Sequence, residues 1–253
     1  MPLKVPPLKK VFTKSAKVLG GLTGSVLGLY GAFILTFYAG RGDPLSAGDR
    51  QLLHDMFGEK FDVSDIRTHF HDKSSMDYKI ANFFLPGKKA MAMPLTSHIV
   101  FFDSSVYARD FTALDAQDTA NVRKIGYFGH ESFHDLQYKT DLNMKKIGLY
   151  KYHLSPEKKF SDYGIEQQAE MVERYLKVVF FNDTSNVDGI NDTLLIKTVE
   201  DRFPTSRATR LRIEDGKAKT GRADFCWKDL YPEGFGAVKK TRTSTGRPAT
   251  TSR

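Results

Sequence analysis

Hydrophobic and polar residues divide this chain into an uncharged stretch near the N-terminus and a longer part with the mixed pattern of a folded domain. Residues 18–40 contain no charged side chain. A helix of this length, at about 1.5 Å per residue, would cross a bilayer core of about 30 Å. We therefore predict a transmembrane helix over 18–40. Its basic flank, 1–17, would stay in the cytoplasm and the bulk of the chain would lie outside it.

Two other interpretations of residues 18–40 stay open. A cleavable signal peptide is one, although cleavage near the end of the segment would put an aromatic residue where a small one is preferred. A helix buried within a domain is the other, although each glycine lowers helix propensity in water by about 1 kcal/mol. Gly20, Gly24 and Gly28 recur at every fourth position, a spacing that favours self-association of membrane helices.

From residue 41 to residue 238 the pattern predicts one α+β domain. Turn residues separate short apolar runs, and these runs predict strands over 61–71, 77–85 and 97–103. The last of them, Ser-His-Ile-Val-Phe-Phe-Asp, has the clearest strand pattern because its apolar residues are continuous and turn residues bound it.

Two helices are predicted after these strands. The first begins at a capping aspartate, Asp115 or Asp118, and continues through Tyr138. The second covers 164–181, where apolar residues fall on a single stripe of the helix surface. Further along the chain the periodic signals weaken, and the Thr-, Ser- and Arg-rich segment 239–253 is typical of a disordered tail.

Charge and cysteine content narrow the function classes. Ten basic residues within the first 17 and the last 15 positions exceed the net charge of +8, so the middle of the chain is close to neutral. Basic ends alone are a weak sign of nucleic-acid binding, and we do not expect that function. The one cysteine, Cys226, excludes an intrachain disulfide and a cysteine-based zinc site. We expect it to pack as a small core residue.

The segment His130-Glu131-Ser132-Phe133-His134 carries the clearest chemical signal. Residues four apart lie on one face of a helix, so both imidazoles can bind one metal ion. Glu131 lies one position round the helix, where its carboxylate can act as a general base without binding the metal. This layout is typical of zinc hydrolases. We predict His130 and His134 as Zn²⁺ ligands and Glu131 as the catalytic base.

A catalytic zinc ion needs a third protein ligand, and the second predicted helix offers Glu166. Its place at the edge of the apolar stripe puts the carboxylate at the margin of the core, which is costly unless it is paired or bound to a metal. Glu170, one turn further, can accept the remaining ring N–H of a ligand histidine, and Glu173 is a further candidate. The alternative is that the three glutamates form a solvated face of the helix.

The HExxH motif followed by Glu-x-x-Ala-Glu at 166–170 resembles the glutamate-zincin metallopeptidases, in which the first of these glutamates is the third zinc ligand. More narrowly, segments 97–111, 130–137 and 150–170 resemble the zincin-like proteins found beside Rhs and Vgr secretion elements of Gram-negative bacteria. The resemblance covers roughly residues 97–181. It implies a small mixed sheet, an active-site helix with HExxH and a second helix with the glutamate ligand.

Two residues depart from the usual zincin pattern. Asp135 follows the second histidine, where an uncharged residue is usual. Its carboxylate could bond the ligand histidine or a nearby lysine, or it could mark a degenerate site. Gly129, just before the motif, weakens the helix, but a glycine also lets a neighbouring strand or a substrate come close. Neither departure removes a required ligand or the base.

Other parts of a catalytic site are less well defined by the sequence. By analogy with zincins, the strand at 99–102 would lie along the cleft and pair with an extended peptide. Tyr152 or His153 are candidates for the oxyanion donor, although His153 also fits an ordinary surface loop. His69 and His71 face one side of a strand and could bind a metal, but we expect them to be exposed polar residues of the strand.

These features support two hypotheses for function. The first is a zinc-dependent hydrolase of peptide or amide bonds, anchored to the membrane through 18–40 or delivered as a secreted effector. The second is a catalytically inactive zincin-fold module that acts as an interaction protein of a secretion system, with a structural or lost metal site.

Overall fold

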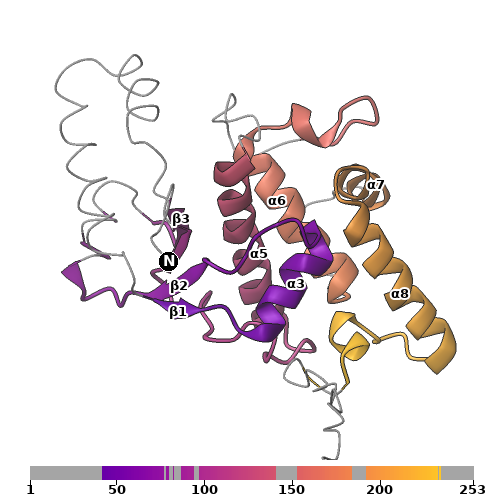
Figure 1. Cartoon of the computed structure of the whole chain (residues 1–253), viewed down its shortest axis with the longest axis horizontal. Helices are drawn as coiled ribbons and strands as arrows, with labels where there is room; N and C mark the ends of the chain where they lie inside the picture. The colour runs from indigo at the N-terminus through magenta and orange to yellow at the C-terminus, as the bar shows by residue number, and fades with distance from the viewer. Residues whose placement is uncertain are drawn as a thin grey trace, which may run out of the picture.

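The computed structural model describes residues 42–76, 78–79, 82, 87–93, 97–140, 153–183, 192–232 and 234. The two predicted terminal segments, 1–17 and 239–253, and the predicted transmembrane helix at 18–40 lie outside these residues. Among the helices of the described part, none is long and apolar enough to span a membrane. The predicted α+β class is confirmed for this part, in which one small sheet packs against several helices (Figure 1).

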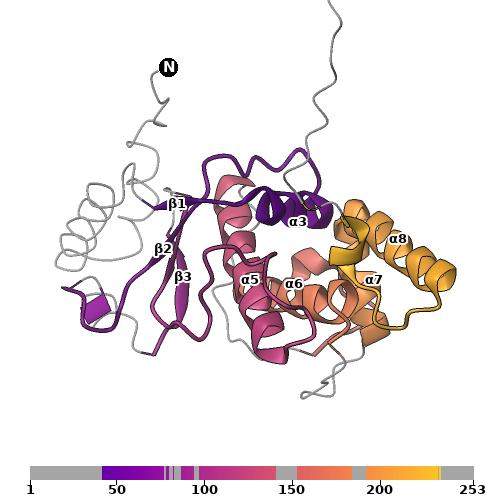
Figure 2. The ribbon, with the colours of Figure 1, turned by 90° about the horizontal axis from the view of Figure 1, so that it is seen from below.

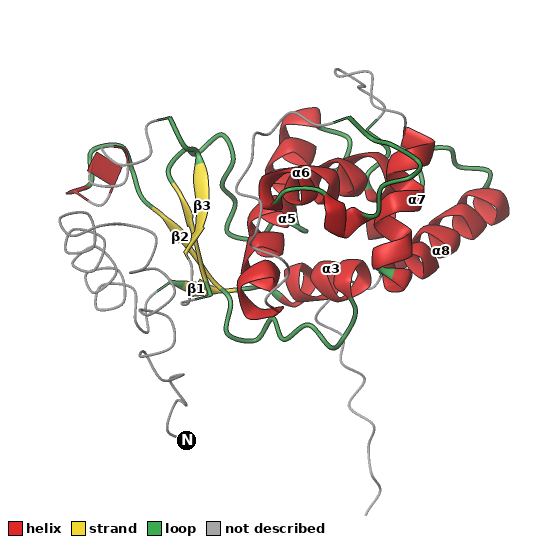
Figure 3. Ribbon diagram, turned by 90° about the horizontal axis from the view of Figure 1, so that it is seen from above, coloured by secondary structure: helices red, strands yellow, loops and turns green. Residues whose placement is uncertain are grey.

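Four short strands form one mixed sheet in the order β1-β2-β4-β3. The strands are β1 (Asp43–Pro44), β2 (Arg67–Phe70), β3 (Ala90–Met93) and β4 (His98–Phe101). β2 and β4 run parallel, whereas β1 and β3 pair antiparallel with their neighbours. Figures 2 and 3 show this sheet on one side of the molecule and the helices on the other.

The strands agree only in part with the predictions from sequence. The strand predicted at 97–103 is confirmed as β4, and the one predicted at 61–71 is shortened to β2. The strand predicted at 77–85 is wrong, because its described residues 78, 79 and 82 are helical. The Ser75 hydroxyl accepts a hydrogen bond from the Tyr78 N–H at 3.1 Å, and such a bond favours the start of a helical turn.

The strand β3 was not predicted, because its sequence Ala-Met-Ala-Met has low β-propensity. It is extended because it pairs antiparallel with β4, with Ala92 opposite Ile99. In the described sheet β3 is an edge strand, and it packs against α5, the helix that carries the HExxH motif.

The two predicted helices are confirmed as α5 (Thr119–Thr140) and α6 (Ile165–Tyr175). Asp118 begins α5, since its Oδ1 accepts a hydrogen bond from the Ala120 N–H at 2.8 Å. α6 continues into a π-helical turn, η2 (Leu176–Phe180). The predicted segment 164–181 is therefore helical almost throughout, but its winding widens near the end.

Two glycines let α5 approach the α6–η2 segment closely. A Cβ atom at Gly129 would lie 2.1 Å from Leu176 Cδ1, and one at Gly126 would lie 2.9 Å from Lys177 Cδ. A side chain at Gly129 would therefore force the buried Leu176 to move, whereas one at Gly126 would displace flexible side chains of the α6–η2 segment. Gly129 serves helix packing, rather than the approach of a strand or substrate.

A cluster of phenylalanines holds another side of α5. Phe133, inside the HExxH motif, is fully buried. Its ring centroid lies 5.6 to 5.9 Å from those of Phe57, Phe160 and Phe203. Aromatic pairs at such distances contribute about 0.5–1.5 kcal/mol each beyond the burial of their surface. This packing fixes the rotation of α5 about its axis, and with it the direction in which the two motif histidines point.

Further helices cover the side away from the sheet: α3 (Ala47–Phe57), α7 (Asp192–Arg202), α8 (Pro204–Thr220) and the short η3 (Trp227–Leu230). Asp55 on α3 accepts hydrogen bonds from Trp227 Nε1 at 2.7 Å and from Tyr231 Oη at 2.5 Å. These bonds tie the segment that follows α8 to α3.

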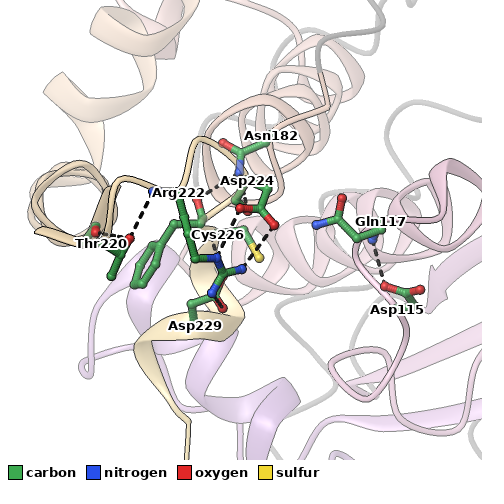
Figure 4. Close-up of polar contacts among 10 residues, drawn as sticks. Asp115, Gln117, Asn182, Thr220, Arg222, Asp224, Cys226 and Asp229 are labelled. Carbon is green, nitrogen blue, oxygen red and sulfur yellow. Dashed lines mark hydrogen bonds and ion pairs between the residues drawn. The ribbon is translucent and has the colours of Figure 1, made fainter. Parts of the chain in front are cut away.

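The link between α8 and η3 is held by polar contacts. Figure 4 shows Arg222 pairing with Asp224 at 3.2 Å and with Asp229 at 3.0 Å. Asn182, at the end of the α6–η2 segment, donates from Nδ2 to the backbone oxygen of Phe225 at 2.9 Å. Cys226 is buried among these residues, as the sequence predicted.

Candidate metal centre

Helix α5 brings the two motif histidines together. His130 Nε2 and His134 Nε2 lie 3.2 Å apart, and both residues are buried. Their ring centroids are 4.9 Å apart, and the ring planes are steeply inclined to each other. Both Nε2 atoms therefore face one point in space, as the four-residue spacing predicted.

Glu166 reaches the same point from the first turn of α6. Its Oε2 lies 3.5 Å from His130 Nε2 and 3.3 Å from His134 Nε2. In a tetrahedral zinc site with zinc–ligand distances of about 2.0–2.1 Å, two ligand atoms are separated by roughly 3.3–3.4 Å. The three separations match this value closely. The donor set of two imidazoles and one carboxylate, with a fourth position left open, fits zinc.

The Glu166 carboxylate itself is consistent with a bound cation. Its Oε2 is buried and accepts no hydrogen bond of ordinary geometry. Burial raises the pKa of Glu166, but contacts with His130 and His134 outweigh this and hold the pKa below its usual range. Burial lowers the pKa of His130, whereas the nearby carboxylates of Glu166 and Glu173 outweigh this and raise it to about 10. The cluster thus attracts positive charge, which a proton or a metal ion can supply.

A second carboxylate lies behind His130. Glu173 Oε2 is 3.4 Å from His130 Nδ1, and Glu173 Oε1 pairs with Lys177 at 3.0 Å. The sequence placed Glu170 first for this role and Glu173 second. The structure gives the Nδ1 contact to Glu173, and Glu170 lies close enough that its carboxylate groups with His130 and Glu173 within 4.8 Å. The role of Glu170 stays a prediction.

The second ring nitrogen of His134 contacts a residue that was not predicted from the sequence. His134 Nδ1 lies 2.7 Å from Gln137 Oε1. The spacing of three residues on a predicted helix was a usable signal, because side chains at i and i+3 are neighbours.

The predicted base, Glu131, is buried beside the histidines and is held by the sheet. Its Oε2 accepts a hydrogen bond from the Ala92 N–H of β3 at 2.7 Å. The strand beside the site is therefore β3. The prediction that the strand at 99–102 lines the cleft is wrong, because β4 is an interior strand flanked by β2 and β3. Glu131 and the edge strand together form one wall of the site.

Asp135 is engaged away from the metal ligands. Its Oδ2 lies 2.9 Å from Lys139 Nζ, and Lys139 also pairs with Asp65 at 2.6 Å. Burial raises the pKa of Asp135, and the nearby Lys139 partly offsets this. Of the roles that the sequence left open for Asp135, the structure shows the contact with a nearby lysine, which fastens the end of α5 to the segment before β2.

A tyrosine at the edge of the site was also missed from the sequence. The Tyr138 ring stacks on His134 with centroids 6.3 Å apart. Burial, together with the charges of Glu131 and Glu166, raises the pKa of Tyr138 to about 12, so its hydroxyl stays protonated at neutral pH. His153 is exposed, and Tyr152 lies outside the described residues.

Two further histidines form a separate pair on the sheet. His69 Nε2 lies 2.5 Å from His98 Nδ1, and both residues are buried. The expectation that His69 is an exposed strand residue is wrong, because the neighbouring strand β4 brings His98 against it. Burial, with the charges of His98 and His71, lowers the pKa of His69 to about 4. In the described part of the chain, the groups of three side chains able to hold a metal both contain His130.

Comparisons with known proteins point to secretion systems. No protein-family model matches the chain. The chain is 27% identical, over 147 residues, to the type VI secretion system spike protein VgrG2b of Pseudomonas aeruginosa strain PAO1. This match covers 53% of the chain and 13% of the spike protein. Among solved structures, the effector domain of Pseudomonas aeruginosa VgrG2b aligns with a TM-score of 0.43 and 23% identity, over 78% of this chain and 93% of that domain. The predicted resemblance to proteins of Vgr elements is confirmed at the level of sequence similarity.

Proposed function

We propose that this chain is a zinc-dependent hydrolase of peptide or amide bonds that acts as an effector of a secretion system. The observation that carries the proposal is the convergence of His130 Nε2, His134 Nε2 and Glu166 Oε2 at separations of 3.2 to 3.5 Å. Structural zinc sites are closed by four protein ligands, whereas the three ligands here leave a fourth position open. The adjacent carboxylate of Glu131 offers a base beside that position. Both features support a catalytic site over a purely structural one.

When bound, zinc would supply a Lewis acid that acidifies water and polarises a carbonyl group. The chain's own residues would handle the protons. Glu131 Oε2 is held by the Ala92 N–H, which leaves Oε1 to accept a proton from the attacking water and to pass it to the leaving amine. The Tyr138 ring lies beside His134, and its hydroxyl is protonated at neutral pH. This hydroxyl would donate a hydrogen bond to the carbonyl oxygen as negative charge develops.

Secretion is the biological setting that we propose for this activity. The similarity to a type VI secretion spike protein supports it. Because the chain matches only 13% of that protein's length, the activity and partners of the spike protein come to this chain as part of the proposal. A secreted effector and a membrane-anchored enzyme remain the two forms of it, since residues 18–40 lie outside the described part.

The inactive interaction module was the competing hypothesis. Its main ground in the sequence was Asp135, which could have marked a degenerate site. The pairing of Asp135 with Lys139 at 2.9 Å gives that residue a packing role and supports the catalytic proposal instead.

Metal analysis of the purified full chain tests the proposal. We expect close to one zinc per parent chain, and loss of zinc in His134→Ala and Glu166→Ala. Glu131→Gln should keep the metal and lose hydrolysis of a quenched-fluorescent peptide library. A parent without zinc, or undiminished zinc in Glu166→Ala, would overturn the ligand assignment. A zinc-loaded Glu131→Gln that hydrolyses peptides as fast as the parent would overturn the assigned base.

A further inference from the structure

Two buried glutamines connect the metal centre to the start of α6. Gln137 on α5 is 0% exposed, and Gln168 on α6 is 1% exposed. Burying a side-chain amide is costly unless its donors and acceptor are all paired. Apolar residues of similar size would fill the same space between α5 and α6, so the presence of two amides calls for a reason beyond packing.

The two amides and His134 form a continuous chain of hydrogen bonds. His134 Nδ1 lies 2.7 Å from Gln137 Oε1, and Gln137 Nε2 lies 3.1 Å from Gln168 Oε1. Gln137 Nε2 also donates to the Ile165 backbone oxygen at 3.2 Å. Gln168 Nε2 donates to the Tyr163 backbone oxygen at 2.7 Å. This series of hydrogen bonds therefore begins at an imidazole nitrogen and ends at two backbone carbonyl groups.

The carbonyl groups fix the direction of every bond in this chain, because a carbonyl oxygen can only accept. Gln168 must turn its NH₂ group to the Tyr163 oxygen, which leaves its Oε1 to face Gln137. Gln137 in turn must present its NH₂ group to Gln168 Oε1 and to the Ile165 oxygen. Its Oε1 then faces His134, so the proton of that imidazole must be on Nδ1. Flipping either amide would set oxygen against oxygen.

We infer that Gln137 and Gln168 are positioning residues that set the tautomer and orientation of His134. The relay, which is this series of hydrogen bonds from His134 through the two glutamines to the backbone oxygens, keeps the proton on Nδ1. It leaves the Nε2 lone pair directed at the metal position. The inference rests on the proposed zinc site and deepens it. A histidine ligand needs this second partner, because either nitrogen of a free imidazole can carry the proton.

The relay also couples the ligands that come from different helices. Its terminal carbonyls, Tyr163 and Ile165, lie on either side of Gly164, the residue that caps α6. Glu166 follows immediately in the first turn. A displacement of α6 would therefore move the third ligand and the orientation of His134 together.

The partners of the two ligand histidines differ in charge. His130 has the Glu173 carboxylate at 3.4 Å, whereas His134 has a neutral amide. Glu131, Glu166 and Glu173 already surround the site with negative charge, and an amide fixes the second ring without adding to it. A carboxylate would accept the same Nδ1 proton, but it would add a charge and could not donate to the Ile165 oxygen or to Gln168 Oε1.

Zinc affinity of the full chain, measured by competition with a chelator, tests the relay. Gln137→Met keeps the length of the side chain and removes the acceptor, so we expect zinc to bind about 10–100-fold more weakly. Gln137→Glu keeps an acceptor for the Nδ1 proton, but its second oxygen faces the Ile165 oxygen and Gln168 Oε1. We therefore expect its affinity to lie between those of Gln137→Met and the parent. Gln168→Met leaves Gln137 anchored by the Ile165 oxygen and should lose less affinity than Gln137→Met. Ser132→Ala, at a buried hydroxyl without a hydrogen bond, is the matched control on α5 and should bind zinc like the parent.

A spectroscopic readout separates positioning from general stability. In protein labelled with ¹⁵N-histidine, the relay predicts a slowly exchanging proton on His134 Nδ1, with and without zinc. That signal should persist in Gln137→Glu and Ser132→Ala and disappear in Gln137→Met. A loss of folding stability alone would not move a proton between ring nitrogens of molecules that remain folded.

The outcomes distinguish the relay from the zinc site. If Gln137→Met binds zinc as tightly as the parent, or if the Nδ1 proton survives in it, the relay is wrong and the zinc site stands. If the parent binds no zinc, the proposed function fails, while the Nδ1 proton of the metal-free parent still reports on the relay. Should Gln137→Met not fold, the Nδ1 proton of Gln137→Glu decides, because its absence from a folded variant that keeps the acceptor would contradict the inference.

Discussion

Carboxylate oxygens are buried in several regions of the described structure, and two of these regions differ in how the oxygens are paired. Where α6, α7 and α8 meet, Glu200 accepts hydrogen bonds from Tyr175 Oη at 2.9 Å and from Arg210 Nε at 2.5 Å. Its second oxygen accepts from Arg210 Nη2 at 3.0 Å. At the α5–α6 site, Glu166 Oε2 is buried between two imidazole nitrogens and accepts no hydrogen bond of ordinary geometry.

The difference separates a carboxylate that holds the fold together from one that is left for a ligand. A buried oxygen without a donor costs about 1–3 kcal/mol, and a bound cation would offset that cost. Glu200 has no such need, because Arg210 and Tyr175 use both of its oxygens. We therefore expect changes at Glu200 and its partners to act on stability, and changes at Glu166 to act on metal binding.

The largest expected effect is the stabilisation of the chain by zinc. At a free zinc concentration 1,000 times Kd, a ligand that binds only the folded state adds about 4 kcal/mol to the free energy of unfolding. We expect this gain for the parent and none for Glu166→Gln, as measured by urea unfolding with and without zinc. If zinc did not shift the unfolding midpoint of the parent, this result would contradict the comparison between Glu166 and Glu200.

Breaking the satisfied carboxylate should have the next largest effect. Arg210→Ala removes the charged partner of Glu200, and losing one member of a buried ion pair costs about 3–5 kcal/mol. The Arg210 side chain is 22% exposed, so we expect the free energy of unfolding, measured with urea, to fall by about 3 kcal/mol, at the low end of that range. Arg210→Lys, which keeps the charge and loses the forked geometry, should fall between the parent and Arg210→Ala.

The same variant also tests whether the metal site and the Glu200–Arg210 pair are independent of each other. Arg210→Ala should keep its full stabilisation by zinc, because Arg210 contacts none of the metal-site residues through a described bond. If zinc affinity fell together with stability, the two regions would not be independent and the comparison would fail.

The candidate site was predictable where chemistry follows local spacing. The four-residue spacing of His130 and His134 on a helix fixes which face they share. The amphipathic stripe of the later helix, together with the HExxH motif upstream, singled out Glu166. Neither inference needed the tertiary fold. The Nδ1 partner of His134 was missed because Gln137 lies on a buried face where an apolar residue is expected, and nothing local to the sequence shows that a second amide pairs with it.

The sheet shows where tertiary contacts decide the structure. β3, the edge strand that bonds Glu131 through the Ala92 N–H, has a sequence of alternating alanine and methionine that predicts no strand. Its conformation comes from pairing with β4, the next strand along the chain, and from packing against α5, which lies further along the chain. α8 is a different case, because Pro204 at its start and Gly221 beyond its end, with a φ of 69°, were usable boundary signals. Its weak amphipathic pattern hid them.

A third buried carboxylate tests whether hydrogen bonding alone makes such a group stable. Asp49 Oδ1 accepts from the Phe111 N–H and the Thr112 N–H, both at 3.1 Å. Even so, burial, with the charge of Asp110, raises the pKa of Asp49 to about 6. The folded state therefore binds a proton more tightly than the unfolded state. Stability from this residue is fully present below the unfolded pKa of 3.8 and is lost as the pH rises through about 6.

Asp49→Asn should remove this pH dependence, which is the smallest of the expected effects. With the two pKa values above, raising the pH from 4.5 to 7 should lower the free energy of unfolding of the parent by about 2 kcal/mol through Asp49. An asparagine can keep both backbone bonds, since they converge on one oxygen, and it carries no charge. The free energy of unfolding of the variant, measured with urea across this pH range, should therefore exceed that of the parent by more as the pH rises. A parallel pair of stability curves would show that the two backbone bonds fully compensate the buried charge, and Asp49 would then belong with Glu200 among the satisfied carboxylates.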